Sequence, residues 1–109
     1  MEKAEVSAEQ IERVSQMEAA LVRLNDAITT VDAALDTYEQ MWDDYRDLDS
    51  YYSGKAWWED LEADNQGLLP DDLPRGVLSE DAAYDALGNA EALRERLKEI
   101  AQSGYSSKN

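Results

Sequence analysis

Residues 7–49 contain neither glycine nor proline, and they carry a heptad repeat of apolar side chains. Such a repeat is typical of a long helix that pairs along a narrow seam. Ser7 and Gln10 have the spacing of a capping box, so we expect the helix to begin there. Roughly 40 helical residues at about 1.5 Å each predict a rod of about 60 Å. The two registers of the seam are Val14, Leu21, Ile28, Leu35 and Trp42, and Met17, Leu24, Val31, Tyr38 and Tyr45.

Turn residues separate this helix from two shorter ones. Asp49-Ser50 and Ser53-Gly54 end the first helix, Lys55 to Asp64 predict a short second helix, and Gly67 is its expected stop. Pro70 and Pro74 favour an extended loop over residues 68–76. The apolar residues in and just after this loop are expected to pack on the helices; they are Leu68, Leu69, Leu73 and Val77.

A third helix is expected from its cap at Ser79 to about Gln102. Its predicted buried stripe is Ala83, Ala86, Leu87, Ala90, Leu93, Leu97 and Ile100. The fold class is therefore all-α: a long N-terminal helix packed antiparallel on a shorter C-terminal helix, with a short middle helix and packed loop at one end. We expect a frayed N-terminus (1–6), a single helical domain (7–102) and a loose tail (103–109).

The third helix is much shorter than the first, so it covers only part of the seam. The N-terminal part would then expose Val14, Met17, Leu21 and Leu24, and an apolar stripe of that length is usually covered. Two copies could pair through it, another protein could cover it, or the first helix could bend near Asn25-Asp26 or Thr29-Thr30. Because no helix breaker stands there, we expect a homodimer.

Composition excludes several chemistries. The chain has no cysteine and no histidine, so thiol nucleophiles, zinc sites built on these residues and Ser-His-Asp triads are absent. The apolar runs are only a few residues long, so the sequence predicts neither a signal peptide nor a membrane span. We expect a cytoplasmic protein that is not an enzyme and has no cofactor and no metal.

The charge is the most suggestive feature for function. The formal net charge is −15. Between Asp36 and Asp85, 15 acidic residues stand against three basic ones, and 11 of the 15 are Asp. Such a chain should avoid nucleic acid and anionic membranes and attract basic protein surfaces. The predicted partner-binding residues, here called the acidic belt, are Asp36, Glu39, Asp43, Asp44, Asp47, Asp49, Glu59, Asp60, Glu62 and Asp64.

Other interpretations of individual residues are weaker. Asp60, Glu62 and Asp64 alternate as in a calcium loop, but the sixth and twelfth positions hold Asn65 and Asp71 in place of the required Gly and Glu. A carboxylate di-metal site or a glycosidase pair lacks the histidines or the cleft that those sites need. In each of the pairs Tyr51-Tyr52 and Trp57-Trp58 we expect one ring to face the core. We expect Arg75 to tie the loop to helix carboxylates, and Gly76 to adopt a conformation that favours glycine.

The central part of the chain holds five motifs, which cover about a third of the chain: Tyr51-Tyr52, Trp58 to Asp64, Gly67-Leu68-Leu69-Pro70, Arg75 to Asp81, and Tyr84 to Leu87. In these motifs the chain resembles a family of small acidic bacterial helical proteins called domain of unknown function 4298. The resemblance implies a helical fold, and it implies no activity and no site residue.

The sequence therefore predicts a non-enzymatic acidic binding protein that engages a basic protein surface. Our specific hypothesis is a DNA-mimic inhibitor of a nuclease or nucleic-acid-binding complex, of the anti-CRISPR or anti-restriction type, from a bacterium or phage. The alternative is a structural or assembly protein that acts through its heptad seam as a homodimer. A small metal-carboxylate enzyme is the third class.

Overall fold

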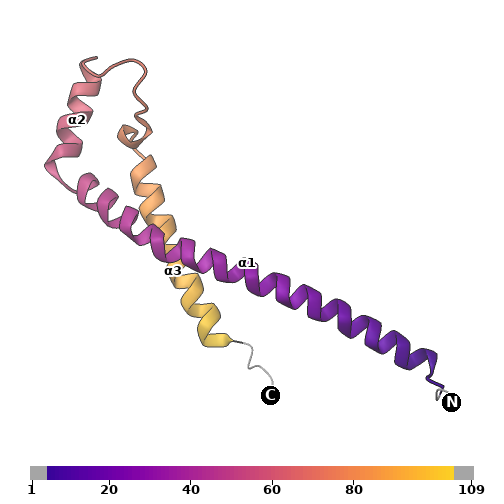
Figure 1. Cartoon of the computed structure of the whole chain (residues 1–109). Coiled ribbons are helices and arrows are strands. Elements are labelled where there is room, and N and C mark those ends of the chain that lie inside the picture. The colour runs from indigo at the N-terminus through magenta and orange to yellow at the C-terminus, as the bar shows by residue number, and fades with distance from the viewer. Residues whose placement is uncertain (1–4, 105–109) are drawn as a thin grey trace. The chain divides into compact units, whose positions relative to one another are not determined.

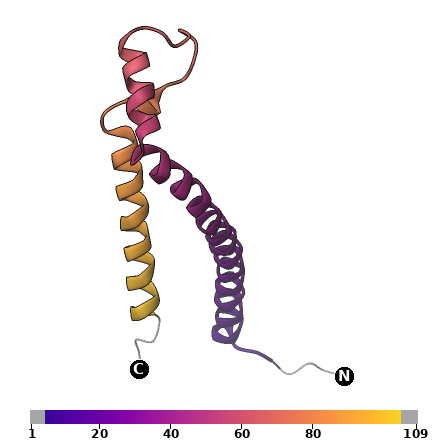
Figure 2. The ribbon, with the colours of Figure 1, turned by 90° about the vertical axis from the view of Figure 1, so that its left-hand side faces the viewer.

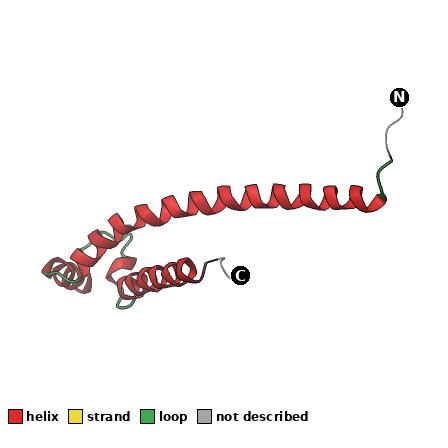
Figure 3. Cartoon of the chain, turned by 90° about the horizontal axis from the view of Figure 1, so that it is seen from below, coloured by secondary structure: helices red, strands yellow, loops and turns green. Residues whose placement is uncertain are grey.

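A computed structural model describes residues 5–104, and every regular element in that range is helical (Figures 1 and 3). The elements are α1 (Ala8–Tyr52), α2 (Lys55–Asn65), a 3-10 turn η1 (Gly76–Leu78) and α3 (Ala82–Ser103). The predicted all-α fold, with a long first helix, a short middle helix and a shorter last helix, is confirmed. Residues 1–4 of the expected frayed N-terminus and 105–109 of the expected tail lie outside the described range.

The chain divides into two compact units, Met1–Gln40 and Met41–Asn109. In its described part, the first unit is α1 up to residue 40, preceded by a short segment without regular structure. The second unit combines the C-terminal turns of α1 with α2, η1 and α3. Within the second unit, α3 runs opposite in direction to α2 and to the last turns of α1 (Figure 2).

The predicted capping box begins α1. The backbone N–H of Gln10 donates to Oγ of Ser7, and the backbone N–H of Ser7 donates to Oε1 of Gln10, both over 3.0 Å. These reciprocal bonds satisfy donors that the first helical turn leaves without partners. The helix then continues through Asn25-Asp26 and Thr29-Thr30, the places where a bend was considered. The hydroxyl of Thr29 donates a hydrogen bond to the backbone carbonyl of Asn25, four residues earlier. This bond lies within α1 and does not interrupt the helix.

Two glycines set the ends of α1 and α2. A Cβ on Gly54 would lie 3.0 Å from the backbone oxygen of Ser50, so a side chain in this tight passage between the two helices would require the backbone to shift by a few tenths of an ångström. Gly67 has φ of 72°, a left-handed conformation that side chains disfavour. The N–H of Gly67 donates to the carbonyl of Asp64, and that of Leu68 donates to the carbonyl of Ala63. This is the Schellman pattern, and the predicted stop at Gly67 is confirmed.

The core of the second unit lies around η1, which packs against both α2 and α3. Trp57, Leu78 and Ala83 are the buried residues among those described, and each comes from a different element. The indole N–H of Trp57 donates to the carbonyl of Val77 over 3.0 Å. The ring of Tyr52 packs edge-on against that of Trp57, with centroids 5.2 Å apart. One large side chain therefore holds η1 against α2.

The expected packing of the loop is wrong in part. Leu68 is 69% exposed, and Leu73 is also exposed. The loop turns so that Leu78, at its far end, enters the core in their place. The prediction for Gly76 is also wrong, since its φ is not positive and nothing lies within 4 Å of the site of a Cβ.

The predicted stripe of α3 is covered best near its start. Ala83 is buried, and Leu87, Ala90 and Leu97 are half-buried. Ala86, Leu93 and Ile100 are exposed. The contacts of the second unit therefore hold the N-terminal half of α3 best, where small alanines allow close approach.

Candidate protein-binding surfaces

The acidic belt is divided between the two units. Asp36 and Glu39 belong to the first unit, and the other eight members belong to the second. We therefore define the acidic surface by the second unit alone. Its members on α1 are Asp43, Asp44, Asp47 and Asp49, and those on α2 are Glu59, Asp60, Glu62 and Asp64.

Few of these carboxylates are neutralised by cations. The three basic residues between Asp36 and Asp85 each pair with one acid: Arg46 with Asp43, Lys55 with Glu59, and Arg75 with Asp64. The other 12 acids of that segment, which lies wholly within the described residues, form no ion pair. The segment thus keeps most of its negative charge accessible to a partner.

Asp44 and Asp47 are the least engaged members of the acidic surface. Within residues 5–104, their side chains make no hydrogen bond or ion pair, and both are exposed. Both residues lie in the interior of α1, whose backbone is fixed by helical hydrogen bonds. Their short side chains therefore hold charge close to a rigid scaffold.

Other members are tied to their neighbours by neutral donors. The hydroxyl of Tyr51 donates to Oδ2 of Asp60 over 2.6 Å, linking the end of α1 to α2. Burial, together with this bond, raises the pKa of Tyr51 to about 12. The side-chain amide of Gln66 donates to Glu62 over 2.8 Å. These carboxylates have structural roles as well as charge.

Arg75 fastens the loop to α2, as predicted. Its Nη1 donates to Oδ1 of Asp64 over 2.9 Å, and its Nη2 lies 3.5 Å from the carbonyl of Asp71. Both side chains of the ion pair are about one-third exposed. Asp64 is consequently the member of the belt with the clearest structural role.

The aromatic pairs behave differently from each other. Trp57 is 5% exposed and Trp58 is 64% exposed, so the expectation of one inward ring is confirmed for the tryptophans. It is wrong for the tyrosines, because Tyr51 and Tyr52 are both half-buried. They sit at the helix end, where Tyr51 reaches Asp60 and Tyr52 reaches Trp57.

Sequence reasoning missed a hollow beside α3. It has a volume of about 370 Å³. Tyr84 on its wall is 68% exposed, and Gly88 contributes no side chain to fill it. The signal in the sequence is Gly88 inside a helix, because glycine there costs about 1 kcal/mol of helix stability relative to alanine. A Cβ added at this position would have no atom within 4 Å. The lining residues are Tyr45, Tyr84, Asp85, Leu87, Gly88, Asn89 and Glu91.

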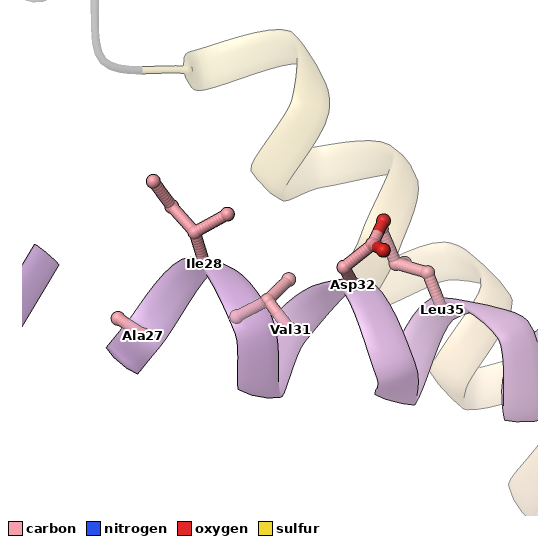
Figure 4. Close-up of a pocket in the computed structure, with 5 residues that line it drawn as sticks. All are labelled: Ala27, Ile28, Val31, Asp32 and Leu35. Atoms are coloured by element: carbon pink, nitrogen blue, oxygen red, sulfur yellow. The ribbon is translucent and has the colours of Figure 1, made fainter. Parts of the chain in front are cut away.

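The predicted seam is exposed in the first unit. Val14, Met17, Leu21 and Leu24 are 50–66% exposed, and the exposed row continues through Ile28, Val31 and Leu35. Figure 4 shows the C-terminal part of this row, where Ala27, Ile28, Val31, Asp32 and Leu35 line a hollow of about 400 Å³. The carboxylate of Asp32 lies among these otherwise apolar side chains.

Comparison with known proteins identifies the family. The sequence pattern of the family described as Domain of unknown function (DUF4298) matches residues 14–100. The chain therefore belongs to this family, as its central motifs predict. No curated protein and no solved structure matches the chain.

No helix within residues 5–104 has the length and apolar character needed to cross a membrane. In the same range, no group of three or more carboxylates has the arrangement of a metal site.

Proposed function

We propose that this chain is a non-enzymatic acidic binding protein whose acidic belt engages a basic surface of a nucleic-acid-binding protein. The observation that carries the proposal is the set of 12 carboxylates between Asp36 and Asp85 that lack a cationic partner. In this role the chain acts as a DNA mimic that inhibits a nuclease or a related complex, of the anti-CRISPR or anti-restriction type. Its expected setting is the cytoplasm of a bacterium, with a bacterial or phage origin.

The predominance of aspartate supports mimicry over simple solubility. Proteins that bind duplex DNA place lysine and arginine against a dense row of phosphates, and the binding depends steeply on salt. Asp44 and Asp47, which lack a cationic partner, are three residues apart on α1, which sets them about 4.5 Å apart along the helix axis. A helix with short, regularly spaced carboxylates therefore presents a row of fixed negative charges. The basic groove of a DNA-binding protein can bind this row in place of phosphates.

The hollow beside Tyr84 supports a basic partner in a second way. Asp85, which forms no ion pair within the described residues, lines it together with two tyrosine rings, whereas Glu91 on its wall already accepts hydrogen bonds from Tyr45 and Arg94. A guanidinium or ammonium group gains from carboxylates and from the face of an aromatic ring. An arginine or lysine of the partner would fit the space that Gly88 leaves open.

Affinity capture from the organism that encodes the chain tests the proposal. The tagged protein should retain a nucleic-acid-binding protein at low salt and release it at high salt, because the contact is electrostatic. Recovery of no basic or nucleic-acid-binding partner contradicts the proposal. So does a partner whose retention is unchanged by salt.

A second candidate function is favoured by the exposed seam. The chain would be a structural or assembly protein that forms a homodimer through α1, with the acids serving solubility. Variants separate the two candidates. Neutralising Asp44 and Asp47 should weaken partner binding about tenfold under the first proposal and leave assembly intact under the second. Charged residues in place of Leu21 and Leu24 should have the reverse effect.

A further inference from the structure

Little of the apolar surface of the described residues is covered. Trp57, Leu78 and Ala83 are the buried residues among them, and all three belong to the second unit. In the first unit, no residue from 5 to 40 is buried. The apolar side chains of α1 in that unit therefore lack a cover.

A continuous apolar row lies on α1 in the first unit. Seven successive seam positions from Val14 to Leu35 are aliphatic, and each side chain is 43–66% exposed. Their spacing alternates between three and four residues, which is the spacing that packs against a second helix with the same repeat. The seam of α1 itself has this repeat, so a second copy of the chain is a fitting occupant.

The two flanks of the row differ in size and charge. One flank carries Ala20, Ala27 and Ala34, preceded by Arg13. The other flank carries Glu18, Asn25, Asp32 and Glu39. In heptad terms these are the g and e positions, which decide partner choice and orientation.

We infer that the apolar row of α1 pairs with the same row of a second copy, in parallel and in register. In this arrangement the alanine flank of each copy lies against the acidic flank of the other, so carboxylates do not face carboxylates. Arg13 of one copy lies opposite Glu18 of the other, an attractive pair. This inference rests on the second proposed function and names its partner and geometry.

The antiparallel alternative has less favourable charges. The antiparallel register that uses all seven aliphatic positions pairs Val14 with Tyr38 and Leu21 with Val31. That register sets Glu18 of one copy opposite Asp32 of the other, twice, and leaves Arg13 without an acidic neighbour. Like charges at flanking positions destabilise a helix pair and suppress the wrong orientation.

Disulfide cross-linking tests the orientation directly, because the chain has no cysteine of its own. Met17→Cys and Val31→Cys are prepared as separate full-length variants and oxidised at micromolar concentration. In the parallel pair each cysteine faces its own counterpart, so both variants should form covalent dimers. In the antiparallel pair the two copies of Cys would be separated by about 27 Å for residue 17 and about 15 Å for residue 31.

One result would overturn the parallel orientation. In it, neither Met17→Cys nor Val31→Cys forms a covalent dimer alone, whereas a mixture of Met17→Cys and Leu35→Cys does. That result would retain the assembly function and reject the orientation. A monomer at micromolar concentration by light scattering would reject both, and it would leave the acidic proposal unaffected.

Leu21 and its neighbour Val22 provide a matched control for the row. Both are 50% exposed, but Leu21 belongs to the seam and Val22 does not. Leu21→Glu should raise the dimer dissociation constant by about 100-fold or more, because the pair loses two buried leucines. Val22→Glu adds the same charge and should leave the constant within about threefold. Equal weakening by both variants would contradict the inference.

Discussion

The hydroxyl of Tyr45 donates a hydrogen bond to Oε2 of Glu91 over 2.6 Å, and this bond joins α1 to α3 within the second unit. Arg94 donates to the other oxygen of the same carboxylate over 3.0 Å. The bond from Tyr45, followed by that from Arg94, lowers the pKa of Glu91. The same bond to Glu91, with burial, raises the pKa of Tyr45. The tertiary contact therefore depends on a neutral phenol and a charged carboxylate.

Replacement of Tyr45 by phenylalanine tests this contact. Glu91 has a lower pKa in the folded protein than the ordinary value of 4.5. Its stabilising contribution is therefore present above pH 4.5 and is lost as the pH falls through the folded pKa. Tyr45→Phe should lower the Tm at pH 7, and the difference from the wild type should narrow below pH 4.5. A difference that stays constant from pH 7 to pH 3 would contradict the assignment.

The raised pKa of Tyr51 predicts that the folded protein loses stability at alkaline pH. Burial, together with the bond to Asp60, raises its pKa to about 12 from 10.0. A group whose pKa is raised on folding stabilises the protein below the unfolded value, and that contribution disappears as the pH rises from 10 to 12. Absorbance titration should show one tyrosine ionising near pH 12. Tyr51→Phe should remove that step, and its persistence in the variant would assign it to another residue.

The two adjacent tryptophans give a matched test of the core. Trp57→Phe removes the donor to the carbonyl of Val77 and should cost about 1–2 kcal/mol in the free energy of unfolding. Trp58→Phe changes an exposed ring and should stay within about 0.5 kcal/mol of the wild type. Urea unfolding, followed by circular dichroism, measures both. Equal losses would contradict the assignment of Trp57 to the core.

Local chemistry made much of this fold predictable. Ser7 and Gln10 satisfy each other's backbone groups, and Gly67 adopts a left-handed conformation after α2. Both features depend on residues a few positions apart, so the sequence contains all the information they need. The heptad repeat likewise predicts α1, because a periodic pattern is a property of the element itself.

Tertiary choices were less predictable. The sequence indicates that one of Trp57 and Trp58 faces inward, but not which one. It predicts a packed Leu68, whereas Leu78 is the leucine that enters the core. The outcome depends on where the loop places η1, and Trp57 decides this through its bond to Val77, a contact between residues 20 positions apart. The hollow beside Tyr84 was missed for the same reason, since it needs α1 and α3 together.

The ion pair between Arg75 and Asp64 should stabilise the second unit modestly. A double-mutant cycle with Arg75→Met and Asp64→Asn should give a coupling of about 0.5–1 kcal/mol, because the pair is partly exposed. The pair of Arg46 and Asp43 is a control, as its side chains are 67% and 76% exposed. Its coupling should be near zero. A larger coupling for the control pair would contradict the structural role of Arg75.

The central claim is that the accessible carboxylates bind a protein that otherwise holds DNA. The most direct measurement uses the immobilised chain to retain proteins from the native lysate. Duplex DNA is then added, and the amount of protein that the DNA displaces is measured. The comparison is between the wild type, Asp44→Asn with Asp47→Asn, and a control with Asp26→Asn and Glu99→Gln. The control removes the same charge at exposed residues outside the segment from Asp36 to Asp85.

The account predicts that the wild type retains a DNA-displaceable protein and that the control retains it within about twofold. The variant with Asp44→Asn and Asp47→Asn should retain about tenfold less of this protein, because the contact loses two fixed charges. Retention that DNA does not displace, or equal retention by all three proteins, would contradict the account.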